Sequence, residues 1–113
     1  MNKKKILKAV EILNEELIAI ENNPEEKITA IVTNKMEIPI PNSYLKKLNM
    51  KEFVGIIEYK KCIMISNKYN QKSKIDENGF LAVPMKIQNE IVLNSGDSVE
   101  IFLEGDYIAI LKQ

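Results

Sequence analysis

Apolar residues near the N-terminus recur at the spacing of an α-helix. Within residues 3–21 they follow one another at steps of four and three, which places them on one helix face as a short heptad seam. Asn22, Asn23 and Pro24 end the pattern, because proline cannot continue the helical hydrogen-bond ladder. The seam consists of Ile6, Val10, Leu13, Leu17 and Ile20. Residues 1–27 are therefore predicted to form an amphipathic helix and its linker.

Two interpretations of this seam are open. Its side chains pack on the remainder of the same chain, or they pair with the seam of a second chain and make a homodimer. In both cases the seam is predicted to be a protein-interaction surface. A solution mass near 13.0 kDa would indicate the first arrangement, and twice that mass would indicate the second.

Beyond residue 27 the apolar residues change to a period of two, which is typical of β-strands. Short β-branched runs are separated by turn residues, and the order strand, strand, proline, short helix and hairpin occurs twice. The first occurrence covers residues 28–66 and the second covers residues 74–113. Between them, residues 67–73 are polar and without periodicity, so they are predicted to be a linker.

The two occurrences align as an internal repeat. An offset of 43 residues matches Pro41 with Pro84 ahead of the short helices, which are expected at residues 42–48 and 85–91. After the helices the offset becomes 45, and it matches the alternating apolar residues of the two hairpins. The shift falls in a loop, where insertions cost little. Repeats of this length indicate units that bury their apolar faces together, although unrelated hairpins also share such patterns.

The second repeat carries a family resemblance. Its elements resemble, in their order, those of AbrB/MazE/SpoVT domains. The order is a turn with Gly79, then Pro84 and a short helix, then Gly96 and Asp97 ahead of an alternating strand. Residues 74–111 resemble this family well, and the first repeat resembles it more weakly. The resemblance implies a swapped-hairpin fold, in which two units exchange hairpins to close one barrel. A unit of about 40 residues is marginal alone, which agrees with two units sharing a core.

The predicted fold class is therefore mainly β with short helices. It is a swapped-hairpin, AbrB-like β-barrel built from two internal repeats of one chain, preceded by the N-terminal amphipathic α-helix.

The composition excludes several kinds of active site. The chain has no His and one Cys, so Cys/His zinc sites, Ser-His-Asp triads and Cys-His dyads cannot form. Its four glycines are too scattered to make a phosphate-binding loop. Cys62 lies in a predicted strand, where a packed side chain is expected rather than a nucleophile. No enzymatic activity, metal or cofactor is therefore expected.

The expected location is the cytoplasm. No apolar run reaches the roughly 18–20 residues that span a bilayer, so no membrane association is predicted. Acidic residues interrupt the apolar stretch behind the N-terminal lysines, which is unlike a secretory signal. The single cysteine also fits a reducing compartment.

The net charge is zero, but the charge is distributed unevenly along the chain. Residues 32–73 contain 8 Lys and 3 Glu, a net charge of +5, whereas residues 74–113 contain 3 Lys and 7 Asp or Glu, a net charge of −4. The chain also has no Arg, the residue best suited to reading guanine and gripping phosphate, which disfavours base-specific contacts. A codon preference for Lys in an AT-rich genome explains the same absence.

The resemblance implies DNA binding through basic residues near the first turn and the short helix. The Arg that family members often place after the turn glycine is replaced by Glu37 in the first repeat and Phe80 in the second. Gln88 and Asn89 replace the basic pair of the second helix, while the first helix keeps lysines. The predicted DNA-binding residues are Asn34, Lys35, Lys46, Lys47 and Lys51. These lysines also fit an ordinary solvated face, and lysines on phosphate give affinity but little sequence information.

The acidic second repeat supports a second hypothesis. Its carboxylates suit a basic partner surface, as expected of an antitoxin or a phage-type inhibitor that keeps the fold and has lost DNA binding. Solubility alone also explains them. The residues are Asp76, Glu77, Glu90, Asp97, Glu100, Glu104 and Asp106. The sequence thus predicts a DNA-binding transcriptional regulator first and a protein-binding module second.

Overall fold

The computed structural model describes residues 27–113, which form eight strands and two short helices. The elements are β1 (Lys27–Ile31), β2 (Glu37–Pro39), α1 (Asn42–Lys47), β3 (Phe53–Tyr59), β4 (Cys62–Ser66), β5 (Lys72–Lys74), β6 (Phe80–Ala82), α2 (Met85–Ile91), β7 (Ser98–Glu104) and β8 (Tyr107–Lys112). The prediction of a mainly β protein with short helices is confirmed. The predicted N-terminal helix, with its seam from Ile6 to Ile20, lies outside the described residues.

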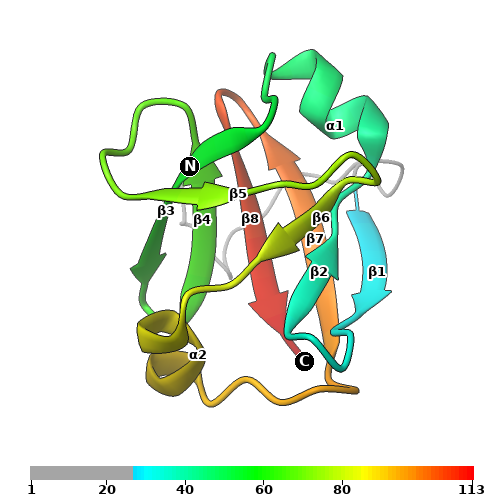
Figure 1. The fold of residues 1–113 in the computed structure, drawn as a ribbon, viewed down its shortest axis with the longest axis vertical. Coiled ribbons are helices and arrows are strands. Elements are labelled where there is room, and N and C mark those ends of the chain that lie inside the picture. The colour runs from blue at the N-terminus through cyan, green and yellow to red at the C-terminus, as the bar shows by residue number, and fades with distance from the viewer. Residues whose placement is uncertain (1–26) are drawn as a thin grey trace, which may run out of the picture.

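The strands form two layers. Six of them make an antiparallel sheet in the order β1-β7-β8-β4-β3-β5, and β2 pairs with β6 in a separate ribbon. Figure 1 shows this ribbon in front of the sheet, with α1 near one end of the molecule and α2 near the other. A bridge between Ile75 and Leu81 joins the ribbon to the chain that leaves β5.

The predicted closed barrel is not found among residues 27–113. β1 and β5 are the two edges of the six-stranded sheet and do not pair with each other. The strands β2 and β6 are three residues long, and they pair with each other instead of extending either edge. The described residues therefore form an open sheet covered by a short ribbon.

Most strand pairs join the first half of the chain to the second half. β1 pairs with β7, and β5 pairs with β3. The pairs β2–β6 and β4–β8 also cross between the halves, while the hairpins β3–β4 and β7–β8 are local. β5 begins at Lys72, inside the segment predicted to be a linker, because Lys72–Lys74 pair with the edge of β3.

The registers of the two halves correspond. Ala30 lies opposite Val99 on β1 and β7, and Ser73 lies opposite Val54 on β5 and β3. The offsets of 43 and 45 residues found in the sequence convert the first pair into the second. The offset of 45 alone converts the Ile63–Ile110 pair on β4 and β8 into Ile65–Ile108. The alignment of the two repeats is thus also an alignment of their hydrogen-bond ladders.

Two hydrogen bonds show the same correspondence beside the ribbon. The N–H of Ile40 donates to the carbonyl of Gly79 at 2.9 Å, and the N–H of Val83 donates to the carbonyl of Met36 at 3.3 Å. Each bond ties the entrance of one helix to the turn of the other half. These two contacts fix where each turn lies relative to the helix of the other half.

One apolar core lies between the layers and takes side chains from both halves. Alternate residues of each sheet strand face it, as the period of two predicts. The ribbon contributes Ile38 and Leu81, which lie opposite each other, and α1 contributes Tyr44 and Leu45. The large side chains that are less than 2% exposed are Ile38, Ile56, Ile63, Ile65, Leu81, Ile101, Ile108, Ile110, Val32, Val54 and Val99.

A substitution at the centre of the ribbon tests whether the halves form one core. Leu81→Ala removes a fully buried side chain from the second half, so it should destabilise the protein by about 2–5 kcal/mol. Met85→Ala, at a residue that is 68% exposed, should change the stability by less than about 0.5 kcal/mol. Urea denaturation followed by circular dichroism measures both. Amide-exchange protection of β3 and β4 should fall together with that of β7 and β8, and loss confined to the second half would contradict a shared core.

The second helix ends on a strained residue. Val92 has φ 54° and ψ 57°, the left-handed region, where a β-branched side chain is an outlier. The N–H of Leu93 donates to the carbonyl of Gln88 at 2.8 Å, which is the long bond of a Schellman helix end, a motif that usually has glycine at the position of Val92. At α1 the equivalent position is Asn49, which has φ 55° and a residue type that tolerates this conformation. Val92 is 62% exposed, so little packing offsets its strain.

Val92→Gly should therefore stabilise the protein by about 1 kcal/mol, because glycine adopts positive φ without the steric penalty of Cβ. Asn49→Gly is the matched control, and it should change the stability by no more than a few tenths of a kcal/mol. Urea midpoints of the two variants give the comparison. Destabilisation by Val92→Gly would mean that the isopropyl group makes a contact worth more than the backbone strain.

Candidate nucleic-acid interface

All five predicted DNA-binding residues are exposed. Lys46 and Lys47 occupy the last turn of α1, and Lys51 follows in the loop before β3. Asn34 and Lys35 lie in the turn between β1 and β2. The set therefore spans two separate places in the fold.

Each turn lies beside the helix of the other half. A Cβ added at Gly79 would lie 3.1 Å from the carbonyl oxygen of Ile40, which shows how closely the turn 76–79 approaches the start of α1. The turn 33–36 lies instead beside the start of α2, because it accepts the hydrogen bond from the N–H of Val83. The structure thus brings Lys46 and Lys51 to the acidic second turn, with Lys47 next to Lys46 in the last turn of α1. It places the other two predicted residues next to α2.

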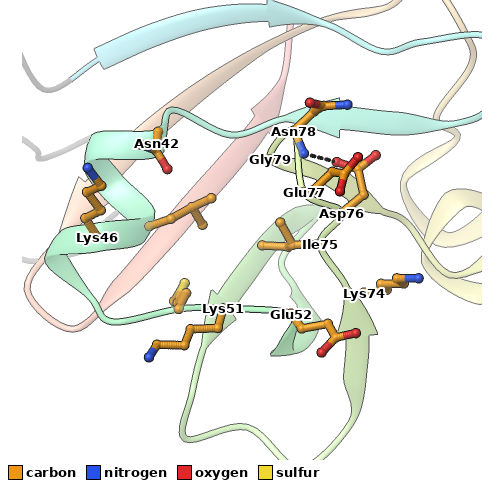
Figure 2. Close-up of a pocket in the computed structure, with 12 residues that line it drawn as sticks. Asn42, Lys46, Lys51, Glu52, Lys74, Ile75, Asp76, Glu77, Asn78 and Gly79 are labelled. Carbon is orange, nitrogen blue, oxygen red and sulfur yellow. Dashed lines mark hydrogen bonds between the residues drawn. The ribbon is translucent and has the colours of Figure 1, made fainter.

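An open groove of about 600 Å³ runs between α1 and the turn 76–79. Figure 2 shows Asn42 and Lys46 on α1 at one side of this groove, Asn78 on the turn at the other, and Ile75 between them. The charged residues that line it are Lys46, Lys51, Glu52, Lys74, Asp76 and Glu77. Three lysines and three carboxylates therefore border the groove, which gives its lining no net charge.

The lysines of residues 27–113 fall into two groups. One group uses its ammonium nitrogens in hydrogen bonds or ion pairs with described residues, and consists of Lys27, Lys61, Lys68, Lys72 and Lys112. A second group forms no such bond within the described chain, and consists of Lys35, Lys46, Lys47, Lys51, Lys60, Lys74 and Lys86, of which Lys60 lies over the ring of Tyr59. All four predicted DNA-binding lysines belong to the second group. Their ammonium groups are thus available to an external anion.

Three further polar residues, which the sequence pattern does not indicate, lie near the predicted DNA-binding residues. Asn42 and Lys74 border the groove beside α1, and Lys86 lies in the first turn of α2, next to the turn 33–36. Lys74 joins α1 only because β5 pairs with β3, a long-range contact. No local pattern in the sequence signals that pairing.

The ribbon between the two turn–helix pairs carries no basic side chain. Glu37 and Phe80, at the positions where the family often has Arg, belong to β2 and β6 and are half-buried. Glu37 lies opposite Ala82, and Phe80 lies opposite Pro39. The centre of this face is therefore acidic and apolar, with the lysines at its ends.

Four carboxylates of the acidic second half take part in local structure. The carboxylate of Asp76 accepts backbone N–H groups within its own turn. Lys68 donates a hydrogen bond to Asp106 and thereby lowers the pKa of that carboxyl below its ordinary value. The four engaged residues are Asp76, Asp97, Glu100 and Asp106. This half is thus less of a continuous acidic surface than its composition indicates.

Comparison with known proteins adds no relative. No protein-family model matches this chain, and no curated protein matches it. Within residues 27–113 no three His, Cys, Asp or Glu side chains gather where they could hold a metal ion. None of the described helices is long and apolar enough to cross a membrane.

The single cysteine is half-buried on β4. Burial, together with the nearby carboxylate of Glu58, raises the pKa of the Cys62 thiol to about 12. A thiol with such a pKa holds little of the reactive thiolate at neutral pH. Cys62 therefore has the properties of a packed side chain and not of an activated nucleophile.

Alkylation of Cys62 by iodoacetamide at pH 8 should be at least about tenfold slower in the native protein than in urea. Its rate should keep rising with pH up to about 12. The unfolded thiol loses its proton around pH 9.0, whereas the native thiol keeps it up to about pH 12. The free energy of unfolding should therefore fall as the pH rises from 9.0 to about 12. Mass spectrometry of the labelled protein measures the rates. Equal rates for native and unfolded protein would contradict the burial.

Proposed function

We propose that the chain is an AbrB-like swapped-hairpin protein whose two copies lie in one polypeptide. The crossed strand pairs, the corresponding registers and the reciprocal bonds at Ile40 and Val83 support this assignment. So does the sequence order around Gly79, Pro84 and Gly96, which resembles that family. In this arrangement each copy completes the sheet edge and the core of the other.

We infer further that the protein is a non-enzymatic DNA-binding regulator. The observation that carries this proposal is the group of exposed, uncommitted lysines on and after α1, namely Lys46, Lys47 and Lys51, with Lys74 across the groove. Exposed ammonium groups without internal partners are suited to replacing the counterions of DNA phosphates. Asn34 and Lys35 would meet the backbone at the other end of the ribbon, beside α2.

The proposed contacts favour affinity over sequence readout. Lysine contacts phosphate as a point charge, and the chain has no Arg to read a guanine edge with two hydrogen bonds. Glu37 and Phe80 occupy the middle of the ribbon, where a basic residue would have faced the duplex. Binding is therefore expected to be strongly salt-dependent and weakly sequence-dependent.

A protein-binding role is the alternative, and the same ribbon favours it. An acidic residue and an aromatic residue at the centre of the face, with lysines at its rim, suit a protein partner better than a polyanion. This reading corresponds to an antitoxin or a phage-type inhibitor on the same fold. A stoichiometric protein complex without any affinity for DNA would decide in its favour.

Fluorescence anisotropy with a labelled duplex tests the DNA-binding proposal. Lys46→Gln combined with Lys47→Gln should weaken binding at least about tenfold at low salt and reduce the slope of log K against log salt by about 2. The loss should be similar for duplexes of different sequence, because lysines on phosphate carry little sequence information.

The matched control is Lys60→Gln combined with Lys61→Gln, which removes the same charge from the exposed turn between β3 and β4, beside α2 and not α1. It should leave the salt slope within about half a unit of the wild-type value. If both pairs weaken binding equally, the attraction is only general electrostatics. If the wild-type protein shows no salt-dependent binding at all, the DNA-binding proposal fails.

A further inference from the structure

The six-stranded sheet has a second face, turned away from the core, and that face is apolar. A row of cross-strand neighbours runs over four strands: Ile57 lies opposite Met64, Met64 opposite Ala109, and Ala109 opposite Phe102. None of these side chains belongs to the buried core. Each alternates along its strand with a core residue, which fixes its direction. The row is therefore an apolar band across the centre of the outer face.

A second row lies beside the first. Tyr59 is opposite Cys62, and Cys62 is opposite Leu111. Tyr59 is 53% exposed, while the other two are half-buried. The two rows together are called the outer apolar face, and they consist of Ile57, Tyr59, Cys62, Met64, Phe102, Ala109 and Leu111. An antiparallel sheet that faces water normally presents polar side chains there, so this composition indicates a covered face.

The described residues cover only one margin of this face. The loop after β4 folds over Gly55, where an added Cβ would lie 2.4 Å from the carbonyl oxygen of Tyr69. The ribbon and both helices lie at the opposite face of the sheet, as Figure 1 shows. Within residues 27–113, the rows from Phe102 to Ile57 and from Leu111 to Tyr59 have no covering element.

The start of β1 brings the preceding segment to this face. Lys27 is opposite Phe102, so it continues the first row onto the edge strand, and its ammonium group lies 3.4 Å from the carboxylate of Glu100. The side chains of Lys27 and Glu100 both point to the outer side of the sheet. This follows because Ile101, between Glu100 and Phe102, points to the core. The chain before Lys27 therefore reaches the sheet at the border of the outer apolar face.

The lengths also match. The heptad seam in residues 3–21 covers 15 residues from Ile6 to Ile20, and the 14 steps between these two residues amount to about 21 Å in a helix. The sheet from β1 to β3 is about 19 Å wide, at about 4.8 Å for each of the four steps between strands. The five residues 22–26 can extend over about 17 Å, which is enough to turn the chain back over the sheet.

We propose that residues 3–21 of the same chain pack on the outer apolar face as an amphipathic helix, with the seam from Ile6 to Ile20 turned toward Met64, Ala109 and Phe102. In this arrangement the apolar seam of residues 3–21 and the outer apolar face of the sheet bury each other. The covered sheet then has a helical layer behind it and the ribbon with α1 and α2 in front. The proposal is independent of DNA binding, since the predicted DNA-binding lysines lie at the ribbon side.

Cys62, at the centre of the second row, reports whether the face is covered. In the full chain its alkylation by iodoacetamide should be slow, and Leu13→Asp, which puts a charge into the seam, should accelerate it at least about tenfold. Asn14→Asp adds the same charge one residue further along, at a polar position, and should leave the rate within about twofold of wild type. Circular dichroism and amide exchange of β7 and β8 verify that the sheet itself stays folded.

A second measurement needs no substitution. In the wild-type chain, methyl contacts detected by nuclear Overhauser effects should join Leu13 or Leu17 to Met64 or Ala109, and a mixture of labelled and unlabelled chains should show that they lie within one molecule. Light scattering should then give a mass of one chain, near 13.0 kDa. An unchanged alkylation rate in Leu13→Asp together with the absence of these contacts would overturn the proposal. A mass of two chains, with the contacts formed between molecules, would overturn it in favour of a second copy as the cover.

Discussion

The exchange of strands between the two halves is the constraint on which the rest of the structure depends. In the described chain β1 and β2 hydrogen-bond to β7 and β6, so the first half would leave both strands unpaired without the second. The reverse holds for β5 and β6. Unpaired backbone groups beside an apolar interior are costly, and a unit of about 40 residues buries too little surface to compensate. Ile38 and Leu81 meet at the centre of this exchange, so the core closes only when both halves are present.

The same exchange decides which side chains share a surface. Because each turn lies beside the helix of the other half, every turn–helix pair combines residues from the basic and the acidic part of the chain. Lys46 and Lys51 therefore line the same groove as Asp76 and Glu77, and Lys35 lies in the turn beside the start of α2. The opposite net charges of the two parts do not produce a basic side and an acidic side. They produce two mixed surfaces, of which the one at α1 holds more uncommitted lysines.

Local sequence patterns predict the elements of this protein but not their pairing. α2 has the bounds that Pro84 and the apolar spacing indicate, and α1 ends within one residue of its predicted end, because proline and helical periodicity act within a few residues. β5 is only partly predicted: the second repeat is expected to begin with a strand at residue 74, whereas Lys72 and Ser73 fall in the predicted linker and join the strand through the edge of β3. Barrel closure is wrong for a related reason. The family resemblance implies closure, whereas within residues 27–113 the short β2 and β6 pair with each other and leave two open sheet edges.

The predicted site shows the same division. The exposure of Lys46 and Lys47 follows from helical periodicity, since Tyr44 and Leu45 take the buried positions of that turn. The separation of Lys35 from these lysines cannot be read from the sequence, because it depends on which turn meets which helix. Lys74 was missed on the same ground. Contacts between residues far apart in the chain thus determine which of these side chains lie together. Local sequence determines only which side chains are exposed.

The two faces of the six-stranded sheet have different physical properties. The ribbon side contains the core, both helices and the predicted DNA-binding lysines, so the proposed electrostatic contacts with a partner would lie on that side. The outer side contains Met64, Ala109 and Phe102, whose exposure to water would favour association between chains. An element that covers the outer side would remove this tendency without touching the ribbon side. The two sides can therefore change independently, because the sheet's fully buried isoleucines separate the cover from the lysine-bearing surface.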